Sequence, residues 1–531
     1  MSDPDHAAER PATFREVLAS GEFRAIFFSS ALSSLGDSMA RAAVTALVYQ
    51  RTGSVLAAAA TFAISYLPWL GPGTVLAALA ERYPYRRTMV ICDLARMATI
   101  GLVALPGVPL PALLVLLFVT AMFDPPFKAA RSALNARVLT GDRYVVGLAM
   151  VETAAQVALV TGYFAGGTLA AYSPRLALGF DAATFGISAF IVGLWVHYRA
   201  PALRPERRTH LLRETAEGFK IVFGRRVLRS IAFIVFAGLL FSVVPEGLGA
   251  AWAANLTSDR HARGWTQGLI MCSMPLGFIV GSILINRFLP PAVRQRLISP
   301  FAILIPLALV AALLNPRVYG VAAIAATSGF AVAALLPAAN GLFVQTLPDE
   351  FRARAFGVMQ SGVQLCQGAA VLATGALASR FSLPLVVGLW GAGGVVLMVL
   401  ASITWPTPKA FGEAIAQARR LNDAASPPEP GPPPPAPDGP GLVPDTSGAV
   451  TDNAPAPGGS AHESPGGSAH EPPGGSAHEP PGGSAHESPG GSAHEPPGGS
   501  AHEPPERSPG GRHRAPEGAE SGGPRFTTAS P

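Results

Sequence analysis

Residues 54–87 read SVLAAAATFAISYLPWLGPGTVLAALAERYPYRR. The first 27 of these residues, 54–80, are largely apolar, and a helix that spans a lipid bilayer needs about 20 such residues. One acidic and three basic side chains follow directly, within residues 81–87. An apolar run that ends in clustered arginines is typical of a transmembrane helix whose basic end stays in the cytoplasm.

The rest of the chain repeats this apolar pattern. Of its 531 residues, 49% are hydrophobic and only 14% are charged, which is too apolar for a soluble protein of this size. Twelve stretches have the length and hydropathy of a membrane span: 24–50, 54–80, 88–107, 109–130, 144–171, 176–198, 229–256, 265–288, 297–315, 318–346, 355–380 and 383–405. We therefore predict an all-α membrane protein with twelve transmembrane helices.

The basic residues between the spans predict the orientation of the chain. With the N-terminus inside, the cytoplasmic segments hold 27 Lys and Arg residues, whereas the opposite segments hold 6. Short loops rich in Lys and Arg stay in the cytoplasm. We therefore expect both termini in the cytoplasm and the protein in the plasma membrane.

The longest loop between spans, residues 199–228, divides them into two bundles of six helices, 24–198 and 229–405. Six residues in this loop recur at helical spacing among arginines: Leu211, Leu212, Thr215, Phe219, Val222 and Phe223. This pattern predicts an amphipathic helix on the cytoplasmic lipid surface. Residues 1–23 are polar and are expected to form a cytoplasmic N-terminus.

From residue 406 the composition changes. Sequence rich in proline and glycine leads into near-identical octads, GGSAHEPP or GGSAHESP, with a histidine at every eighth position from His462 to His502. Such sequence has almost no apolar side chains with which to build a core. We therefore predict that residues 406–531 form a disordered tail.

Three motifs lie at the expected cytoplasmic ends of spans. They are Gly73-Thr-Val-Leu-Ala-Ala-Leu-Ala-Glu81-Arg82-Tyr-Pro-Tyr-Arg86-Arg87, with Asp93 and Arg96 after it; Phe123-Asp-Pro-Pro-Phe-Lys-Ala-Ala-Arg131; and Asn340-Gly-Leu-Phe-Val-Gln345, followed by Pro348. Together with the division into six plus six helices, these motifs resemble the major facilitator superfamily. The resemblance covers about residues 14–405 and is greatest to the macrolide-efflux and siderophore-exporter branch of its drug:proton antiporters.

The resemblance implies the major facilitator fold, transport by alternating access and a cytoplasmic gate. The gate residues would be Gly73, Glu81, Arg82, Arg86, Arg87, Asp93, Arg96 and Arg131. In this family the acid, here Glu81, meets the N-terminal end of the eleventh helix near Ala355 when the cytoplasmic side closes. The arginines of the first motif would then pair with Asp93.

Asp37 and Arg41 stand in the middle of the first span. Asp37 lies 13 residues from Arg24 and 14 from Arg51, which places it near the bilayer midplane at about 1.5 Å per residue. Arg41 is within reach of Asp37 by the i,i+4 relation. Two interpretations remain open: a permanent ion pair within the helix, or an Asp37 that is alternately paired with Arg41 and protonated in competition with a cationic substrate.

Other acids also fall within the spans. Glu152 lies close to the expected depth of the cavity, and Glu246 follows Pro245 in the seventh span. Glu246 could be a second proton site, or it could reach the outer membrane interface. Asp124 and Asp181 lie near span ends, where a helix cap or a bond between helices is expected.

These features predict a proton-coupled exporter of drugs or amphipathic secondary metabolites. An alternative, suggested by the histidine octads, is efflux of a divalent metal such as nickel, and one of another class is a membrane receptor or scaffold that does not transport. The sequence shows no nucleotide-binding signature and no Ser/His/Asp or metal-ligand constellation, so we expect no enzyme, no cofactor and no metal site. The expected partners are a small-molecule substrate, protons and the lipid bilayer, not nucleic acid, and the protein is expected to be a monomer.

Overall fold

The computed structural model describes residues 12–71, 73, 75–76, 82–199, 211–348 and 351–425. The regular secondary structure of these residues is helical throughout. The first group of helices is α1 (Phe14–Ala19), α2 (Gly21–Thr52), α3 (Val55–Ala63), η1 (Ile64–Leu70), α5 (Tyr85–Ala104), α6 (Leu110–Met122), α7 (Asp124–Val138), α8 (Asp142–Tyr172) and α9 (Pro174–Trp195). The second group is α10 (Leu211–Gly224), α11 (Arg226–Ser242), α12 (Val244–Gly247), α13 (Gly249–Leu256), α14 (Arg260–Phe288), α15 (Pro291–Arg296), α16 (Ile298–Val310), η2 (Ala311–Leu314), α17 (Val318–Gln345), α18 (Arg352–Ala378), α19 (Leu383–Ile403) and α20 (Pro408–Ala425).

Twelve membrane spans can be traced in the described residues. Eight helical stretches are long and apolar enough to cross a membrane by themselves, and two shorter apolar stretches, Val55–Trp69 and Ile298–Leu314, supply two more. The other two are α2 and α5, which have the necessary length but carry charged side chains in the middle. The predicted all-α membrane fold is therefore confirmed.

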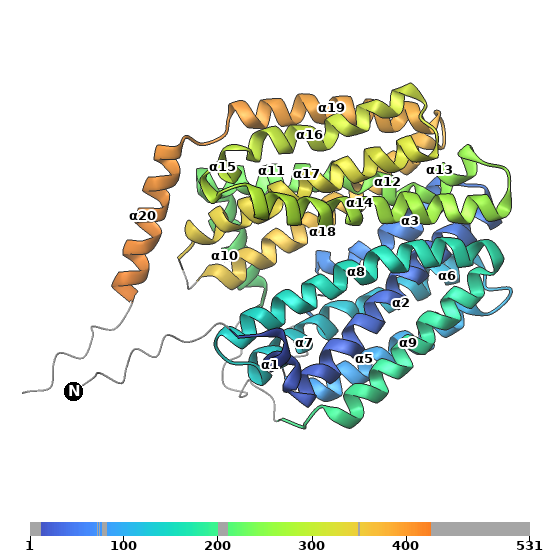
Figure 1. The fold of residues 1–531 in the computed structure, drawn as a ribbon, viewed down its shortest axis with the longest axis horizontal. Helices are drawn as coiled ribbons and strands as arrows, with labels where there is room; N and C mark the ends of the chain where they lie inside the picture. The colour runs from blue at the N-terminus through green and yellow to red at the C-terminus, as the bar shows by residue number, and fades with distance from the viewer. Residues whose placement is uncertain are drawn as a thin grey trace, which may run out of the picture. The chain divides into compact units, whose positions relative to one another are not determined.

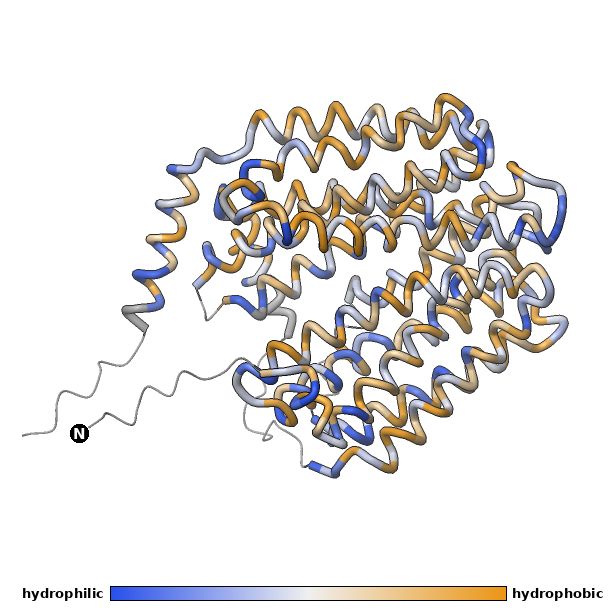
Figure 2. Tube along the Cα trace, viewed as in Figure 1, coloured by the Kyte–Doolittle hydropathy of each residue, from blue (hydrophilic) through white to orange (hydrophobic). Residues whose placement is uncertain are grey.

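The spans form two bundles (Figure 1). The helices α2 to α9, coloured blue to green, lie together, and the helices α11 to α19, coloured green to orange, lie beside them. In the first bundle α2 packs on α8 and α9, and in the second α14 packs on α17 and α16 packs on α19. Figure 2 shows hydrophobic residues along most of each span and hydrophilic residues gathered at the ends, as expected of helices that cross lipid.

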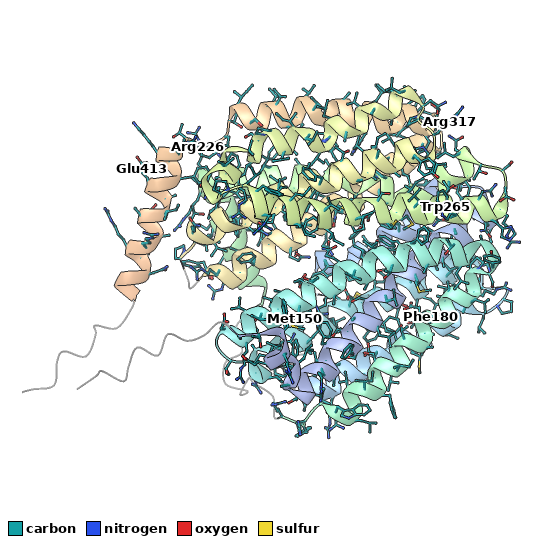
Figure 3. All side chains as sticks on the ribbon, viewed as in Figure 1. Met150, Phe180, Arg226, Trp265, Arg317 and Glu413 are labelled. Atoms are coloured by element: carbon teal, nitrogen blue, oxygen red, sulfur yellow. The ribbon has the colours of Figure 1, made fainter. Side chains whose placement is uncertain are left out.

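The two bundles share two distinct ends. The short-loop end holds the connections at 53–54, 105–109, 173, 257–259, 315–317 and 379–382. The terminal end holds α1, α10, α15 and α20. Trp265 and Arg317 mark the short-loop end in Figure 3, and Arg226 marks the terminal end.

The contacts between the bundles lie towards the short-loop end. There α8 packs on α14, and α18 packs on α3 and η1. A Cβ on Gly167 would lie only 2.5 Å from the backbone nitrogen of Gly268, so α8 and α14 touch backbone to backbone, as small residues allow. Gln267 Nε2 also donates to the carbonyl oxygen of Ala42 at 2.8 Å and to Thr45 Oγ1 at 3.2 Å. These contacts close the short-loop end.

The predicted amphipathic helix corresponds to α10, but its apolar residues do not share one lipid-facing surface. Val222 is fully buried, whereas the stacked rings of Phe219 and Phe223 are exposed. The reason is that α10 packs on α18. A Cβ on Gly218 would lie 2.8 Å from the carbonyl oxygen of Arg354.

The structure corrects the predicted start of the disordered tail. Residues 408–425 form α20, an alanine-rich helix that begins with Pro408 and follows the last span closely. The ring of Phe411 packs on Trp405 with the centroids 5.5 Å apart. A proline in the first turn and alanines in the interior favour a helix. The remainder of the tail, including the histidine octads, lies outside the described residues.

Candidate functional site

A charged cavity of about 550 Å³ lies within the first bundle, between α2 and α5 to α9, and reaches Gln360 of α18. Its walls carry four acidic and four basic side chains: Asp37, Asp124, Glu152, Asp181, Arg41, Arg96, Lys128 and Arg131. Ionised groups in the middle of a membrane protein face water or each other, because lipid solvates them poorly. The cavity is therefore the candidate site.

A second hollow, of about 630 Å³, lies between α2 and α8 and has a different character. Apolar side chains line almost all of it, including Phe27, Leu35 and Met150, which is labelled in Figure 3. By helical periodicity these residues lie on the faces of α2 and α8 opposite to those that line the charged cavity. Because its lining has no titratable group, we place the candidate site in the charged cavity and not in this apolar hollow.

Asp37 is paired with Arg96 of α5, not with Arg41 as the i,i+4 spacing predicted. Arg96 Nη2 lies 2.7 Å from both carboxylate oxygens of Asp37. The guanidinium also lies over the ring of Phe185, 4.2 Å from its centroid. Its side chain is only 4% exposed, against 31% for Asp37. Packing of α5 and α9 thus fixes the arginine, and the carboxylate remains open to the cavity.

Asp124 extends this charged pair along the cavity. Its Oδ1 lies 4.0 Å from Arg96 Nη2, and its Oδ2 lies 2.8 Å from Lys128 Nζ. Asp124 stands in the first turn of α7, where the helix dipole favours a negative charge. It therefore joins α5 to α7, in agreement with the expected bond between helices.

Glu152 and Arg131 line the same cavity from α8 and α7. Their charges interact, and the side chain of Glu152 is exposed to the cavity. Arg131, predicted as a gate residue, thus shares the cavity with Glu152, which was predicted to reach that depth.

Arg41 belongs to a second cluster, which joins the two bundles. Its guanidinium lies 5.6 Å from the ring centroid of Phe62. Its charge also acts on Tyr66, Tyr163 and Glu246, and Tyr163 and Glu246 lie close enough to interact. The cluster therefore connects α2, η1 and α8 of the first bundle to α12 of the second.

Glu246 lies inside this contact and does not reach the outer membrane interface. Its residue is 7% exposed, so the interfacial interpretation is wrong. Pro245 occupies the first turn of the four-residue helix α12, between α11 and α13. Because proline interrupts the helical hydrogen bonds, the seventh span is divided into α11, α12 and α13 here. The short helix α12 places Glu246 in the seam between the bundles.

In this conformation, which is closed at the short-loop end, Asp93 does not pair with Arg82, Arg86 or Arg87 among the described contacts, so the pairing expected on closure of the cytoplasmic side stays a prediction. Asp93 is fully buried and accepts a hydrogen bond from Ser188 Oγ at 2.6 Å. The packing of α5 on α9 encloses Asp93 between the two helices, about two turns along α5 from Arg86 and Arg87 in its first turn.

The three arginines of the first motif lie elsewhere. Arg86 Nη2 donates to the carbonyl oxygen of Gly193, Arg87 lies over the ring of Tyr198 at 5.3 Å, and Arg82 is exposed. Gly73 is packed closely: a Cβ there would lie 2.6 Å from the carbonyl oxygen of Pro68. Glu81 lies outside the described residues, so its contact near Ala355 stays a prediction.

Three polar residues of these clusters escaped the sequence prediction of the site: Tyr66, Tyr163 and Gln267. Tyr163 carried a signal, because it replaces a proline in Gly162-Tyr-Phe-Ala-Gly166-Gly167, which resembles an antiporter motif. Asp181, predicted to be structural, lines the cavity beside Asp37.

Comparison with known proteins agrees with this architecture. The profile of the Major Facilitator Superfamily matches residues 26–317. No curated protein matches the sequence of the chain.

Solved structures with the same fold include three transporters. The nucleoside transporter NupG has a TM-score of 0.56 at 12% identity, over 72% of this chain and 99% of that one. The peptide transporter POT in complex with sulfate has a TM-score of 0.58 at 16% identity, over 77% and 97% of the two chains. A POT family transporter in complex with 5-aminolevulinic acid has a TM-score of 0.59 at 13% identity, over 73% and 96%. At these identities the likeness shows the fold alone.

Proposed function

Since the chain belongs to the major facilitator superfamily, a family of membrane transporters rather than enzymes, we propose that it is a proton-coupled exporter of small molecules that works by alternating access. The observation that carries this proposal is the pair of Asp37 and Arg96 in the charged cavity. A carboxylate held in the middle of a span is costly, by roughly 2.5–3.5 kcal/mol or more without a partner or water. Such a group is retained where it binds a proton or a substrate.

The arrangement of the bundles supports alternating access. The contacts described above hold the short-loop end closed, by α8 against α14 and by α18 against α3. We propose that both termini lie in the cytoplasm and that the membrane is the plasma membrane. The closed end would then face outward, and the cavity would receive substrate from the cytoplasm.

The substrate that suits this cavity is a small organic compound with at least one charged group. A volume of about 550 Å³ lies within the roughly 300–1,000 Å³ usual for small-molecule sites. Its ionisable walls favour the charged end of an amphipathic drug or secondary metabolite over a neutral molecule. Inward proton movement would supply about 2.3 kcal/mol per charge per 100 mV to drive export. Because one chain contains the complete cavity, we propose that a monomer suffices for transport.

The test is transport by the full-length protein in proteoliposomes, with a panel of cationic and zwitterionic compounds and with nickel. We expect uphill transport of at least one organic compound, its loss on addition of a protonophore, and its loss in Asp37→Asn. Glu413→Gln is the matched control, because Glu413 is exposed on α20, far from the cavity (Figure 3). Transport of nickel alone, or no transport of any compound, would refute the proposal.

A further inference from the structure

Asp181 of α9 is the most deeply buried acid of the charged cavity. Its residue is 1% exposed, yet it lines the cavity together with Asp37. Its carboxylate lies against Gly36, the neighbour of Asp37 in the sequence: a Cβ on Gly36 would lie 2.5 Å from Asp181 Oδ1. The absence of a side chain at Gly36 thus lets the carboxylate approach α2 beside Asp37.

Neither carboxylate oxygen of Asp181 has a hydrogen-bond partner among the described residues. The adjacent hydroxyl of Thr184 does not serve, because it donates to the backbone carbonyl of Asp181 at 2.7 Å. The neighbouring cation, Arg96, is bonded to Asp37, and its buried Nε has no acceptor among the described residues. A buried carboxylate without a partner is strongly disfavoured in its charged form. The surroundings of Asp181 in this conformation thus favour a protonated, neutral carboxyl group.

We propose that Asp181 is the residue that binds the transported proton, and that Asp181 and Asp37 compete for Arg96. This inference rests on the proposed function, proton-coupled export. The proton comes from cavity water, bonds to one carboxylate oxygen of Asp181 and returns to water when it leaves. The only other change is a rearrangement of the hydrogen bonds of Arg96.

This competition makes the binding of proton and substrate mutually exclusive. While Asp181 is protonated and neutral, Arg96 stays on Asp37, as observed, and a cationic group cannot use that carboxylate. When the proton leaves, the ionised Asp181 joins Asp37 and Asp124 as carboxylates near one guanidinium, and Arg96 is drawn towards Asp181. Asp37 is then free to bind a cationic group of the substrate. Because each ligand excludes the other, the cycle is an exchange.

The charged groups around Asp181 are consistent with this scheme. α9 packs on α2, α5 and α8. Asp37 acts on Asp181 from α2, and Arg96 acts on it from α5. From α8, Glu152 lines the same cavity. Asp93 of α5 and Asp124 of α7 act on the same Arg96. Arg96 is thus the one basic group that acts directly on Asp181 among the described residues, which makes it the shared partner.

The proton on Asp181 can be tested without a known substrate. Dicyclohexylcarbodiimide reacts with protonated carboxyl groups, and peptide mass spectrometry locates the product. In the purified full-length protein at neutral pH, we expect label on Asp181 and none on Asp37. In Asp37→Asn we expect the label on Asp181 to fall, because Arg96 is then free to pair with an ionised Asp181. Absence of label on Asp181 in the wild type, or unchanged labelling in Asp37→Asn, would overturn the proposal.

An infrared spectrum removes the dependence on access of the reagent. The wild type should show the C=O band of a protonated carboxyl group at neutral pH, and Asp181→Asn should lose it. The difference spectrum between the wild type and a folded Asp181→Asn isolates the band of Asp181 from any band of the other buried acids, Asp93 and Glu246, and absence of a protonated-carboxyl band from that difference would overturn the proposal.

Transport separates this inference from the proposed function. With ethidium as the probe in proteoliposomes under an imposed pH gradient, Asp181→Asn should lose uphill transport together with its pH dependence. If the wild type transports uphill and Asp181→Asn does so equally, the role of Asp181 is refuted and proton-coupled export stands. If the wild type transports no compound of the panel, export is refuted, and the labelling result still decides where the proton lies.

Discussion

Arg96 Nη2 is bonded to both carboxylate oxygens of Asp37 at 2.7 Å, although 59 residues separate the two in the sequence. The pair joins α5 to α2 within the first bundle. Its arginine is buried and its carboxylate is partly open to the cavity. The pair therefore has two roles that can be separated by mutation, one in stability and one in transport.

Replacing Arg96 with Met should destabilise the protein and abolish transport. Loss of one partner of a buried pair costs about 3–5 kcal/mol, but water in the cavity reaches Asp37, so we expect roughly 1–3 kcal/mol. The double variant Arg96→Met/Asp37→Asn should recover most of the stability and none of the transport. Thermal unfolding in detergent provides the measurement, and a double variant less stable than Arg96→Met would contradict the prediction.

Closure of the short-loop end should depend on Gly167. A Cβ there meets backbone atoms of Gly268, which cannot move aside alone, so Gly167→Ala should cost roughly 1–3 kcal/mol of the closed state. Cys272, which is 5% exposed near this seam, should then react faster with a maleimide. Gly101→Ala is the matched control, because a Cβ on Gly101 meets nothing within 4 Å. Equal rates of Cys272 labelling in Gly167→Ala and Gly101→Ala would argue against closure at this contact.

Removing the charge of Glu246 should loosen the same seam. Gln keeps the size of the side chain but loses the attraction to Arg41 and weakens the interaction with Tyr163. We expect a loss of roughly 1–2 kcal/mol, a factor of about 5–30 in the population of the open state. Maleimide labelling of Cys272 should rise accordingly, while that of Cys92, buried within the first bundle, should stay constant. Faster labelling of both cysteines would indicate general unfolding instead.

The attachment of the first span to the central loop should weaken in acid. Glu22, which precedes the predicted span 24–50, is bonded to Arg199 and to the backbone N–H of His197. Burial raises the pKa of Glu22, but the hydrogen bonds and charge of Arg199 and the bonds from His197 outweigh it, so its pKa lies below the ordinary value. A carboxyl with a lowered folded-state pKa stabilises the protein above its unfolded pKa of about 4.3, and this contribution is lost as the pH falls through the folded-state pKa.

Thermal unfolding of the wild type between neutral and acidic pH measures this contribution. The wild type should be more stable than Glu22→Gln at neutral pH, and the two should converge once Glu22 is protonated. A difference that is constant over the whole range would show that the ion pair does not respond to pH.

Docking of α10 on α18 should depend on Gly218. Gly218→Ala places a methyl group 2.8 Å from the carbonyl oxygen of Arg354, so α10 must move, at a cost of roughly 1–3 kcal/mol. Trypsin should then cleave faster after Lys220, an exposed residue of α10. A Cβ on Gly224 meets nothing within 4 Å, so trypsin should cleave Gly224→Ala at the same rate as the wild type. Unchanged cleavage in Gly218→Ala would show that this contact does not hold α10.

The spans were predictable because the length and hydropathy of a span depend only on consecutive residues. A stretch such as 54–80 identifies itself by length and hydropathy, since every spanning helix must satisfy its own backbone. The charged pairs were not predictable in this way. Arg41 is four residues from Asp37 and was the expected partner. The carboxylate of Asp37 is instead bonded to Arg96 of the neighbouring helix α5. The start of the tail was misjudged at 408–425, where alanine content mattered more than the proline-rich sequence beyond it.

The sequence by itself determined a membrane protein of twelve spans in two groups of six, because hydropathy and charge are properties of consecutive residues. It also identified Asp37 and Arg41 as charged residues in the middle of the first span. Only the tertiary structure decided that Asp37 meets Arg96, that Arg41 meets the cluster around Glu246, and that Asp181 has no partner among the described residues. The physical reason is that charges interact over a few ångströms of space, and helix packing, through contacts such as that at Gly36, sets those distances independently of separation along the chain.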